Sequence, residues 1–266
     1  HYYRGALGDE SEAQFVERIT GNLETLIQEE GPETIAAFVA EPVTGASGVI
    51  VPPAGYYEKV QAILERYDIL FWADEVITGF GRTGHLFGCE TVNIHAPAQM
   101  TFAKQLSSAY YPISAAVIRG DLYEAMVEPS AEVGIFGHGY TYSGHPVGCA
   151  AALKTLEIYE RDNLYTNAAD VGDYLQIRLG ELRDHEAVGE VRGVGLIAAV
   201  ELVEDKSSRS PALELAKRVT WLCQENGLIV RNVAGNALAL CPPLIITREQ
   251  VDEIVDKLKR SIDQAM

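Results

Sequence analysis

The residues of this chain whose types and spacing suggest chemistry are acidic side chains that follow short apolar runs. Glu41 follows the run 35–40, and Asp74 follows the run 69–73. Both runs are apolar almost throughout, which is typical of strands in a parallel sheet covered on both faces. Ligands of open α/β sheets collect beyond the carboxyl ends of such strands. The pattern therefore places both acids on the active edge of one sheet, although solvated loop residues would give the same pattern.

Lys104 is the candidate nucleophile. It stands directly behind the apolar segment 100–103. A lysine that is desolvated there would be available as the neutral amine, which is the form that attacks carbonyl carbons and moves protons. A surface lysine whose stem covers apolar atoms would fit the same spacing. The spacing by itself leaves both possibilities open.

Three glycines, at positions 79, 81 and 84, match the GxGxxG pattern of dinucleotide-binding proteins. That fingerprint must follow a strand directly and open a helix. Here the expected strand ends five residues earlier, at Asp74, and residues 85–88 show no helical stripe. The glycines therefore indicate a tight loop rather than a nicotinamide or flavin site.

Four short segments carry a more specific signal through their order. Ala-Glu-Pro-Val at 40–43 is followed by Asp-Glu-Val-Ile-Thr-Gly-Phe-Gly-Arg-Thr-Gly at 74–84, by Met-Thr-Phe-Ala-Lys at 100–104 and by His-Gly-Tyr-Thr-Tyr-Ser-Gly-His-Pro at 138–146. In this order they resemble the class III aminotransferases, a class of the fold-type I pyridoxal-phosphate enzymes. Within that class they are most similar to the ω-amino acid or amine:pyruvate transaminases. The resemblance covers the whole chain, and the segment 74–84 is its most specific part.

The resemblance implies a role for each matching residue. It implies that Lys104 is buried and catalytic and carries pyridoxal 5'-phosphate as a Schiff base. It also implies that Asp74 pairs with the ring nitrogen and that Val76 packs on the ring. Val76 would face the same side as Asp74 if the strand geometry continues. Glu41, at the same edge, is counted with the cofactor-binding residues. Thr141 matches the threonine that binds the cofactor phosphate of the neighbouring subunit, which implies a homodimer with shared active sites.

Arg231 matches the arginine that binds a substrate carboxylate in related transaminases. A guanidinium fork can hold a carboxylate through two parallel hydrogen bonds. A surface arginine and, for Thr141, a turn threonine are the alternatives. His138 and His145 lie in a Gly-rich loop without a metal-binding motif, and we expect no metal.

The chain also departs from the family pattern. We find no candidate for the Ser/Gly-rich phosphate loop that precedes these motifs in the family, and the chain is therefore expected to be a fragment, one part of a split enzyme or a cleavage product. Three positions where the family usually has glycine are occupied by Gln105, Ala109 and Ser114. These side chains would alter the backbone near the cofactor more than the identity of the cofactor.

Alternation of helical and strand-like segments predicts an α/β fold. We expect residues 1–165 to form the C-terminal portion of an incomplete, mostly parallel three-layer cofactor-binding domain, and residues 166–266 to form a smaller C-terminal α+β domain. Capping boxes open helices after Ser11 and after Thr247. The remaining helices are expected at 54–66, 145–160 and 164–185 and from Ser210-Pro211 to Gly227, with strands at 113–118, 194–203, 228–231 and 237–240.

Composition excludes several classes of function. The net charge of −17 disfavours nucleic acid and anionic membrane surfaces as partners. The four cysteines form no CxxC pair, which predicts reduced core thiols rather than a metal or disulfide framework. The N-terminal residues are polar and resemble no secretory leader, so a cytoplasmic location is expected.

The function expected from the resemblance is transamination of an amine or ω-amino acid with a keto acid such as pyruvate. An aminomutase or a decarboxylase on the same scaffold would carry the same motifs. An alternative from outside the enzymes is that the chain is a non-catalytic or incomplete fragment that acts only as a folding or dimerisation module.

Overall fold

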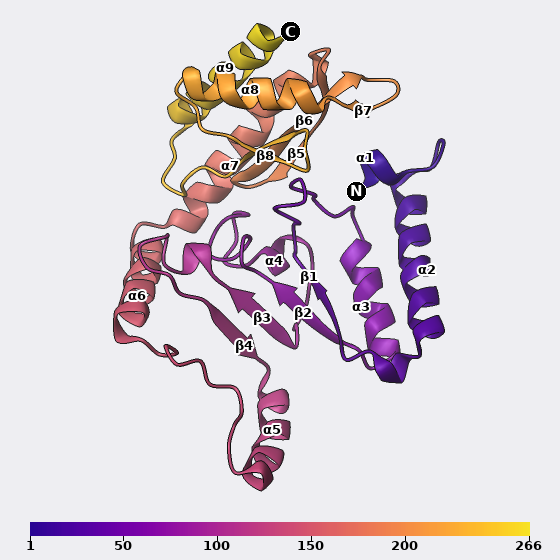
Figure 1. Cartoon of the computed structure of the whole chain (residues 1–266), viewed down its shortest axis with the longest axis vertical. Coiled ribbons are helices and arrows are strands. Elements are labelled where there is room, and N and C mark those ends of the chain that lie inside the picture. The colour runs from indigo at the N-terminus through magenta and orange to yellow at the C-terminus, as the bar shows by residue number, and fades with distance from the viewer.

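Short parallel strands separated by helices build the first sheet of the chain, which a computed structural model describes over residues 1–266 (Figure 1). Strands β1 (Ala37–Ala40), β2 (Leu70–Asp74) and β3 (Gln99–Phe102) run parallel in that order. Strand β4 (Ala115–Ile118) pairs with β3 in the antiparallel direction and forms the edge. The mostly parallel sheet predicted from the sequence is confirmed, whereas β3 was not predicted as a strand.

Helices cover one face of this sheet. Helices α2 (Glu12–Glu30) and α3 (Tyr56–Arg66) pack on the face that carries Phe71 and Ala73, and together they form a buried apolar cluster (Figure 1). The opposite face carries Val39, which is 56 % exposed. The expectation that both faces are covered is therefore wrong for this chain, and the three-layer domain is incomplete on that side.

The other elements of residues 1–163 are shorter or lie at the periphery. They are helices α1 (Tyr2–Gly5), α4 (Gly88–Thr91), α5 (Gly120–Val133) and α6 (Pro146–Arg161), with 3-10 turns at Pro32–Thr34 and Lys104–Leu106. Helix α5, which the sequence pattern did not predict, extends away from the sheet together with the segment that leads to α6 (Figure 1).

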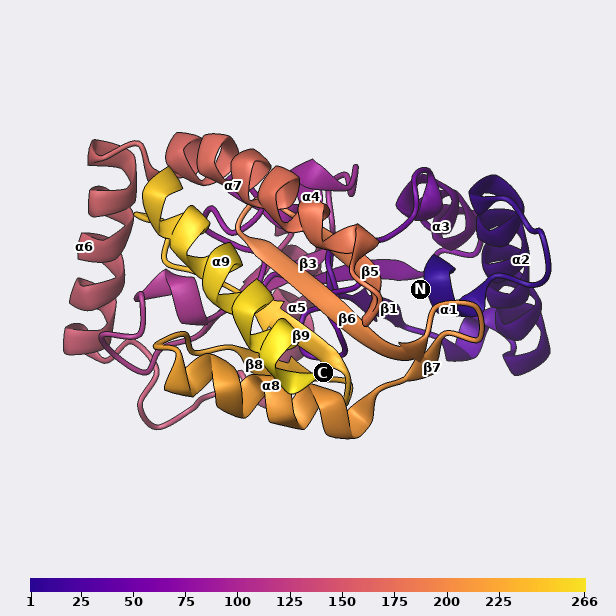
Figure 2. The same ribbon diagram turned by 90° about the horizontal axis from the view of Figure 1, so that it is seen from above.

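The second sheet is antiparallel and has helices on one face. Its strand order is β5-β6-β9-β8, with bounds Val188–Val194, Ile197–Asp205, Ala237–Leu240 and Arg231–Val233. Helices α7 (Leu164–Gly180), α8 (Leu213–Glu225) and α9 (Arg248–Ala265) cover the face that carries Ala198, Val200 and Leu202 (Figure 2). Between α7 and β5 lies a 3-10 turn, Glu181–Asp184. Helix α7 begins close to the predicted domain boundary at residue 165, which stays a prediction.

Local signals in the sequence gave mixed results in this half. The capping box of Thr247 with Gln250 is present, as is that of Ser11 with Gln14 at the other end of the chain. The helix expected to begin at Ser210-Pro211 begins instead at Leu213. Those two residues form strand β7 (Ser210–Pro211), because β6 offers them backbone pairing.

The glycine loop 79–84 lies between the two sheets and packs closely against the backbone of the second half of the chain. The β-carbon of an alanine at position 84 would lie 3.0 Å from Cα of Ala169 in α7, and one at 195 would lie 2.5 Å from the carbonyl carbon of Thr83. Protein backbone therefore occupies the space beside these glycines, which is why side chains are absent there. The loop opens no helix, as the sequence indicated.

The cysteines divide into two groups. Cys89 and Cys223 are buried, whereas Cys149 and Cys241 are exposed, and all are free thiols. The prediction of four core thiols is therefore right for Cys89 and Cys223 and wrong for Cys149 and Cys241. None of the helices combines the length and apolar composition that a membrane crossing requires.

Candidate active site

Three predicted site residues meet at one edge of the first sheet. The register pairs the last residue of β1 with Ala73, so Glu41 is level with Asp74, and it pairs Asp74 with Thr101 of β3. Lys104 follows three residues later. Neighbouring strands lie about 4.8 Å apart, and the three strands end facing the second sheet (Figure 1). The chain thus gathers two carboxylates and one amine at this edge.

Asp74 ends its strand and begins a turn. Its Oδ1 accepts a hydrogen bond from the backbone N–H of Val76 at 3.0 Å, and the side chain is half-buried. This side-chain-to-backbone bond bends the chain away from the strand direction. Strand geometry therefore does not continue to Val76, which was the condition for placing both side chains on one side. The second carboxylate oxygen of Asp74 has no partner within the chain.

Glu41 is held by the loop that follows it. Its Oε2 accepts a hydrogen bond from the backbone N–H of Gly45 at 2.9 Å. The hydroxyl of Tyr57 on α3 donates to the backbone carbonyl of Glu41 at 2.5 Å. The carboxylate is consequently oriented by its own loop, and its position depends on how residues 43–51 are fixed.

Lys104 is exposed, so the prediction that it is buried is wrong for this chain. Its backbone is nevertheless well anchored. Leu106 is buried, and the hydroxyl of Tyr159 on α6 donates to the carbonyl of Gln105 at 2.8 Å. Lys104 also has a positive φ of 44°, in the left-handed region that non-glycine residues seldom adopt. The fold therefore fixes the backbone at this position while the amine is left in solvent.

The remaining candidates lie on other parts of the fold. Thr141 is exposed in the segment between α5 and α6, away from the sheet edge. Arg231 begins β8 and is exposed on the face of the second sheet that also carries Val233. Val233 packs against Val43 and Val49 of the loop that holds Glu41. Arg231 thus belongs to the face that is turned toward the first sheet, whereas Thr141 does not join the others within one chain.

Glu75 is a residue of this edge that sequence reasoning missed. It is only 1 % exposed, and its carboxylate accepts hydrogen bonds from the hydroxyl of Thr78 at 2.5 Å and the backbone N–H groups of Gly88 and Cys89 at 2.9 and 2.7 Å. Burial, together with this carboxylate, raises the pKa of the Cys89 thiol. Successive residues of a strand point to opposite faces. This alternation is the signal in the sequence that could have assigned the side chains of Glu75 and Asp74 to different surroundings.

Arg82 was also missed, although it lies within the most specific motif. It is buried without a carboxylate partner, and its Nη1 donates to the carbonyls of Leu196 and Pro242 at 2.9 and 2.5 Å. Burial lowers the pKa of this guanidinium below its usual value. Both carbonyls belong to the second half of the chain, so Arg82 ties the glycine loop to the second sheet. No short-range pattern in the sequence identifies that partner.

Comparison with known proteins defines the family. The model of the class-III aminotransferases matches residues 3–262. The chain belongs to the class-III aminotransferases, as the ordered motifs indicated. Enzymes of this class depend on pyridoxal 5'-phosphate.

Curated relatives and solved structures agree with that placement. An uncharacterised aminotransferase of Sinorhizobium fredii is 44 % identical over 271 residues, which is 100 % of this chain and 58 % of that protein. The chloroplastic gamma aminobutyrate transaminase 3 of Solanum lycopersicum is 45 % identical, over 98 % of this chain and 51 % of its own length. An omega transaminase of Pseudomonas jessenii in complex with PMP superposes with a TM-score of 0.97 at 48 % identity, covering 100 % of this chain and 59 % of that one. The chain thus spans between half and three-fifths of the length of these proteins, and the fold-type I architecture is confirmed.

The donor set at the sheet edge fits the ring end of the cofactor. A ring nitrogen requires a carboxylate, and an aldehyde requires an amine. Asp74 supplies a carboxylate with a free oxygen, and Lys104 supplies an amine in the turn that follows the neighbouring strand. The hydroxyl of Thr141, exposed and without a hydrogen bond inside the chain, is chemically suited to a phosphate oxygen of another copy.

Proposed function

We propose that this protein transfers an amino group between an amine or ω-amino acid and a keto acid such as pyruvate, with pyridoxal 5'-phosphate held at the edge formed by Glu41, Asp74 and Lys104. The observation that carries the proposal is the register of β2 and β3, which sets the carboxylate of Asp74 beside the strand that leads to Lys104. Family membership supports the reaction class.

Each residue of the chain has a distinct task in this proposal. The bound cofactor supplies the electron sink of the reaction. Asp74 keeps a proton on the ring nitrogen, since a carboxylate at about 3 Å in an effective dielectric of about 20 contributes roughly 5 kcal/mol as an upper figure. Lys104 holds the cofactor and moves the proton at the substrate carbon. Arg231 holds the carboxylate of those substrates that have one. The packing of Val76 against the ring is supported by the family resemblance alone, because the chain turns between Asp74 and Val76.

The exposure of Lys104 and Thr141 supports a homodimer with shared sites. Proton transfer needs an amine that is shielded from water, and a second copy of the chain would supply that cover together with the Thr141 hydroxyl. Large exposed apolar side chains gather on α5 and the segment after it, where such a copy would pack: Val127, Val133, Ile135, Phe136, Tyr140 and Tyr142. The cytoplasmic location stays a prediction.

The test compares Lys104→Ala with Lys217→Ala, which removes an exposed lysine from α8. The purified proteins are incubated with pyridoxal phosphate, dialysed and examined by absorbance and by peptide mass spectrometry after borohydride reduction. We expect a cofactor adduct on Lys104 in the parent protein and in Lys217→Ala, and none in Lys104→Ala. An unchanged adduct and unchanged activity in Lys104→Ala would exclude the assignment.

Product analysis separates the alternatives. Mass spectrometry of an incubation with amine and pyruvate should detect alanine. Cofactor retention without alanine would favour an aminomutase or a decarboxylase, whereas failure of the parent protein to retain cofactor would favour a non-catalytic folding or dimerisation module.

A further inference from the structure

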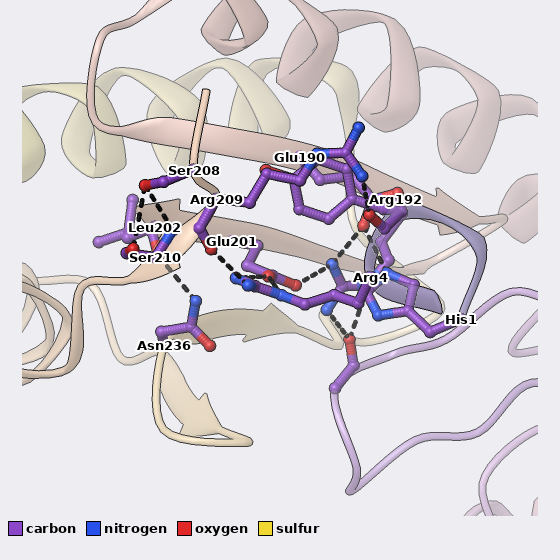
Figure 3. Close-up of polar contacts among 12 residues, drawn as sticks. His1, Arg4, Glu190, Arg192, Glu201, Leu202, Ser208, Arg209, Ser210 and Asn236 are labelled. Carbon is purple, nitrogen blue, oxygen red and sulfur yellow. Dashed lines mark hydrogen bonds and ion pairs between the residues drawn. The ribbon is translucent and has the colours of Figure 1, made fainter. Parts of the chain in front are cut away.

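A partly buried ion network joins the second sheet to the loop that follows β1. Arg192 on β5 has a side chain that is 8 % exposed, and its Nη1 donates to Glu190 at 2.6 Å and to Glu201 at 2.5 Å (Figure 3). Arg4 reaches Glu201 from the N-terminal segment, with Nε at 2.6 Å from Oε1. The charge of Arg192 is therefore matched and its guanidinium is fixed in one orientation.

The other nitrogens of Arg192 bind the loop. Its Nε donates to the carbonyls of Gly48 and Val49 at 2.9 and 3.0 Å, and its Nη2 donates to Gly48 at 2.6 Å. Both carbonyls belong to a tight turn in which the N–H groups of residues 48 and 49 donate to the carbonyl of Gly45. The N–H of Gly45 is the donor to the carboxylate of Glu41. One guanidinium thus holds the turn that orients Glu41.

Arg192 also shares a cross-strand row with Arg231. The registers of the second sheet pair Arg192 with Ala199, Ala199 with Ala239, and Ala239 with Arg231. Residues that pair across a sheet lie on the same face. Arg192 and Arg231 therefore mark the two ends of one row, on the face that packs against Val43 and Val49.

We propose that Arg192 is a positioning residue that sets the distance between Glu41 and Arg231. The carboxylates of Glu190 and Glu201 hold the guanidinium of Arg192, and Arg192 in turn binds the turn at residues 45–49. Arg192 and Arg231 lie at opposite ends of the same cross-strand row, so the turn has a fixed position relative to Arg231. The inference rests on the proposed function, because Glu41 and Arg231 are the groups that face cofactor and substrate there. Arg192 itself touches neither and acts through the turn.

The first test is hydrogen exchange on the purified protein and does not depend on catalysis. Arg192→Ala should lower the protection of the backbone amides of residues 44–50 by about tenfold or more, while α8 and α9 keep theirs. Arg178→Ala is the matched control, because it removes a multiply paired arginine from α7 that has no contact with the loop. Arg192→Lys should protect residues 44–50 little better than Arg192→Ala does, because one ammonium group cannot bind two carboxylates and two carbonyls at the same time.

Chemical rescue distinguishes positioning from loss of stability. Guanidinium at tens of millimolar should enter the space left in Arg192→Ala and restore protection of residues 44–50, whereas urea at the same concentration should not. Unchanged protection of the loop in Arg192→Ala, or an equal loss in Arg178→Ala, would overturn the proposal. Should Arg192→Ala not fold, Arg192→Lys answers the same question through its loop protection.

Substrate preference supplies the second readout. In the cofactor-loaded protein, Arg192→Ala should reduce kcat/KM for every amino donor. The reduction should be about tenfold larger for a donor with a carboxylate than for an amine without one. Added guanidinium should make the two reductions more nearly equal. Equal reductions for both donors would contradict the link to Arg231. A parent protein without transaminase activity would refute the proposed function, whereas the exchange result would still decide whether Arg192 fixes the loop.

Discussion

Glu75 and Asp74 are adjacent carboxylates with different proposed roles, the first in stability and the second in catalysis. Variants of the two residues therefore test the proposed site. Glu75 is 1 % exposed and its two oxygens accept three hydrogen bonds, from Thr78, Gly88 and Cys89. A glutamine in its place has one acceptor oxygen and presents an NH2 group to at least one of these donors. Loss of a hydrogen bond to a charged group amounts to about 1.5–3 kcal/mol, and a buried donor left without a partner adds about 1–3 kcal/mol. We therefore expect Glu75→Gln to lower the free energy of unfolding by about 3–5 kcal/mol.

The assay is thermal unfolding followed by circular dichroism. For chains of roughly this size each kcal/mol lowers Tm by about 2–4 °C, so Glu75→Gln should melt about 6–20 °C below the parent protein. Asp74→Asn is the matched control. Asp74 is half-buried and accepts one backbone hydrogen bond, which an asparagine oxygen can also accept, so its Tm should change by less than about 4 °C.

Activity should show the reverse order. Asp74→Asn removes the charge proposed to keep the ring nitrogen protonated, and kcat should fall by about a hundredfold or more. At a temperature where both variants are folded, Glu75→Gln should keep most of its activity. A Glu75→Gln variant with the parental Tm, or an Asp74→Asn variant that loses stability without losing activity, would refute the division of roles.

Three further outcomes follow from the packing and the charges. A hydrogen bond from Tyr174 is the main cause that lowers the pKa of Asp252. The stability that the Asp252 carboxylate contributes is therefore present above its unfolded-state pKa and is lost as the pH falls through its folded-state pKa. Asp252→Asn should lower Tm at pH 7, and the difference in Tm from the parent protein should vanish well into the acid range. Native-state labelling with iodoacetamide should modify the exposed Cys149 and spare Cys89, whose pKa is raised by burial, and peptide mass spectrometry that finds Cys89 labelled first would contradict the structure. A β-carbon at Gly172 would lie 2.5 Å from the backbone of the loop after β5, so Gly172→Ala should lower Tm by several degrees or more, and an unchanged Tm would show that this contact between α7 and the sheet is not close.

Much of the active edge could be predicted without coordinates. Short apolar runs ending in Glu41 and Asp74 indicated parallel strands, and the order of the motifs indicated the family. The register confirms that both residues share an edge with the strand before Lys104. Strand β3 escaped detection because its alternation of polar and apolar residues extends over only four positions, which is the shortest length that signals a strand.

Other features depend on contacts between residues far apart in the sequence. The covering of the sheet was overestimated, because a run of apolar residues does not reveal whether a second layer is present in the same chain. The helix expected at Ser210 yielded to pairing with β6, which is a tertiary effect that outweighs a local start signal.

The sequence alone determined which residues can do chemistry here, because residue type and motif order are local properties of the chain. Only the tertiary structure decided where those groups lie: it exposed Lys104, buried Glu75 beside its neighbour Asp74, and tied the turn after Glu41 to Arg192. The physical reason is that burial, charge pairing and register are set by tertiary contacts, which no local pattern encodes. Gly48, for example, is bound by Arg192, which lies 144 residues further along the chain.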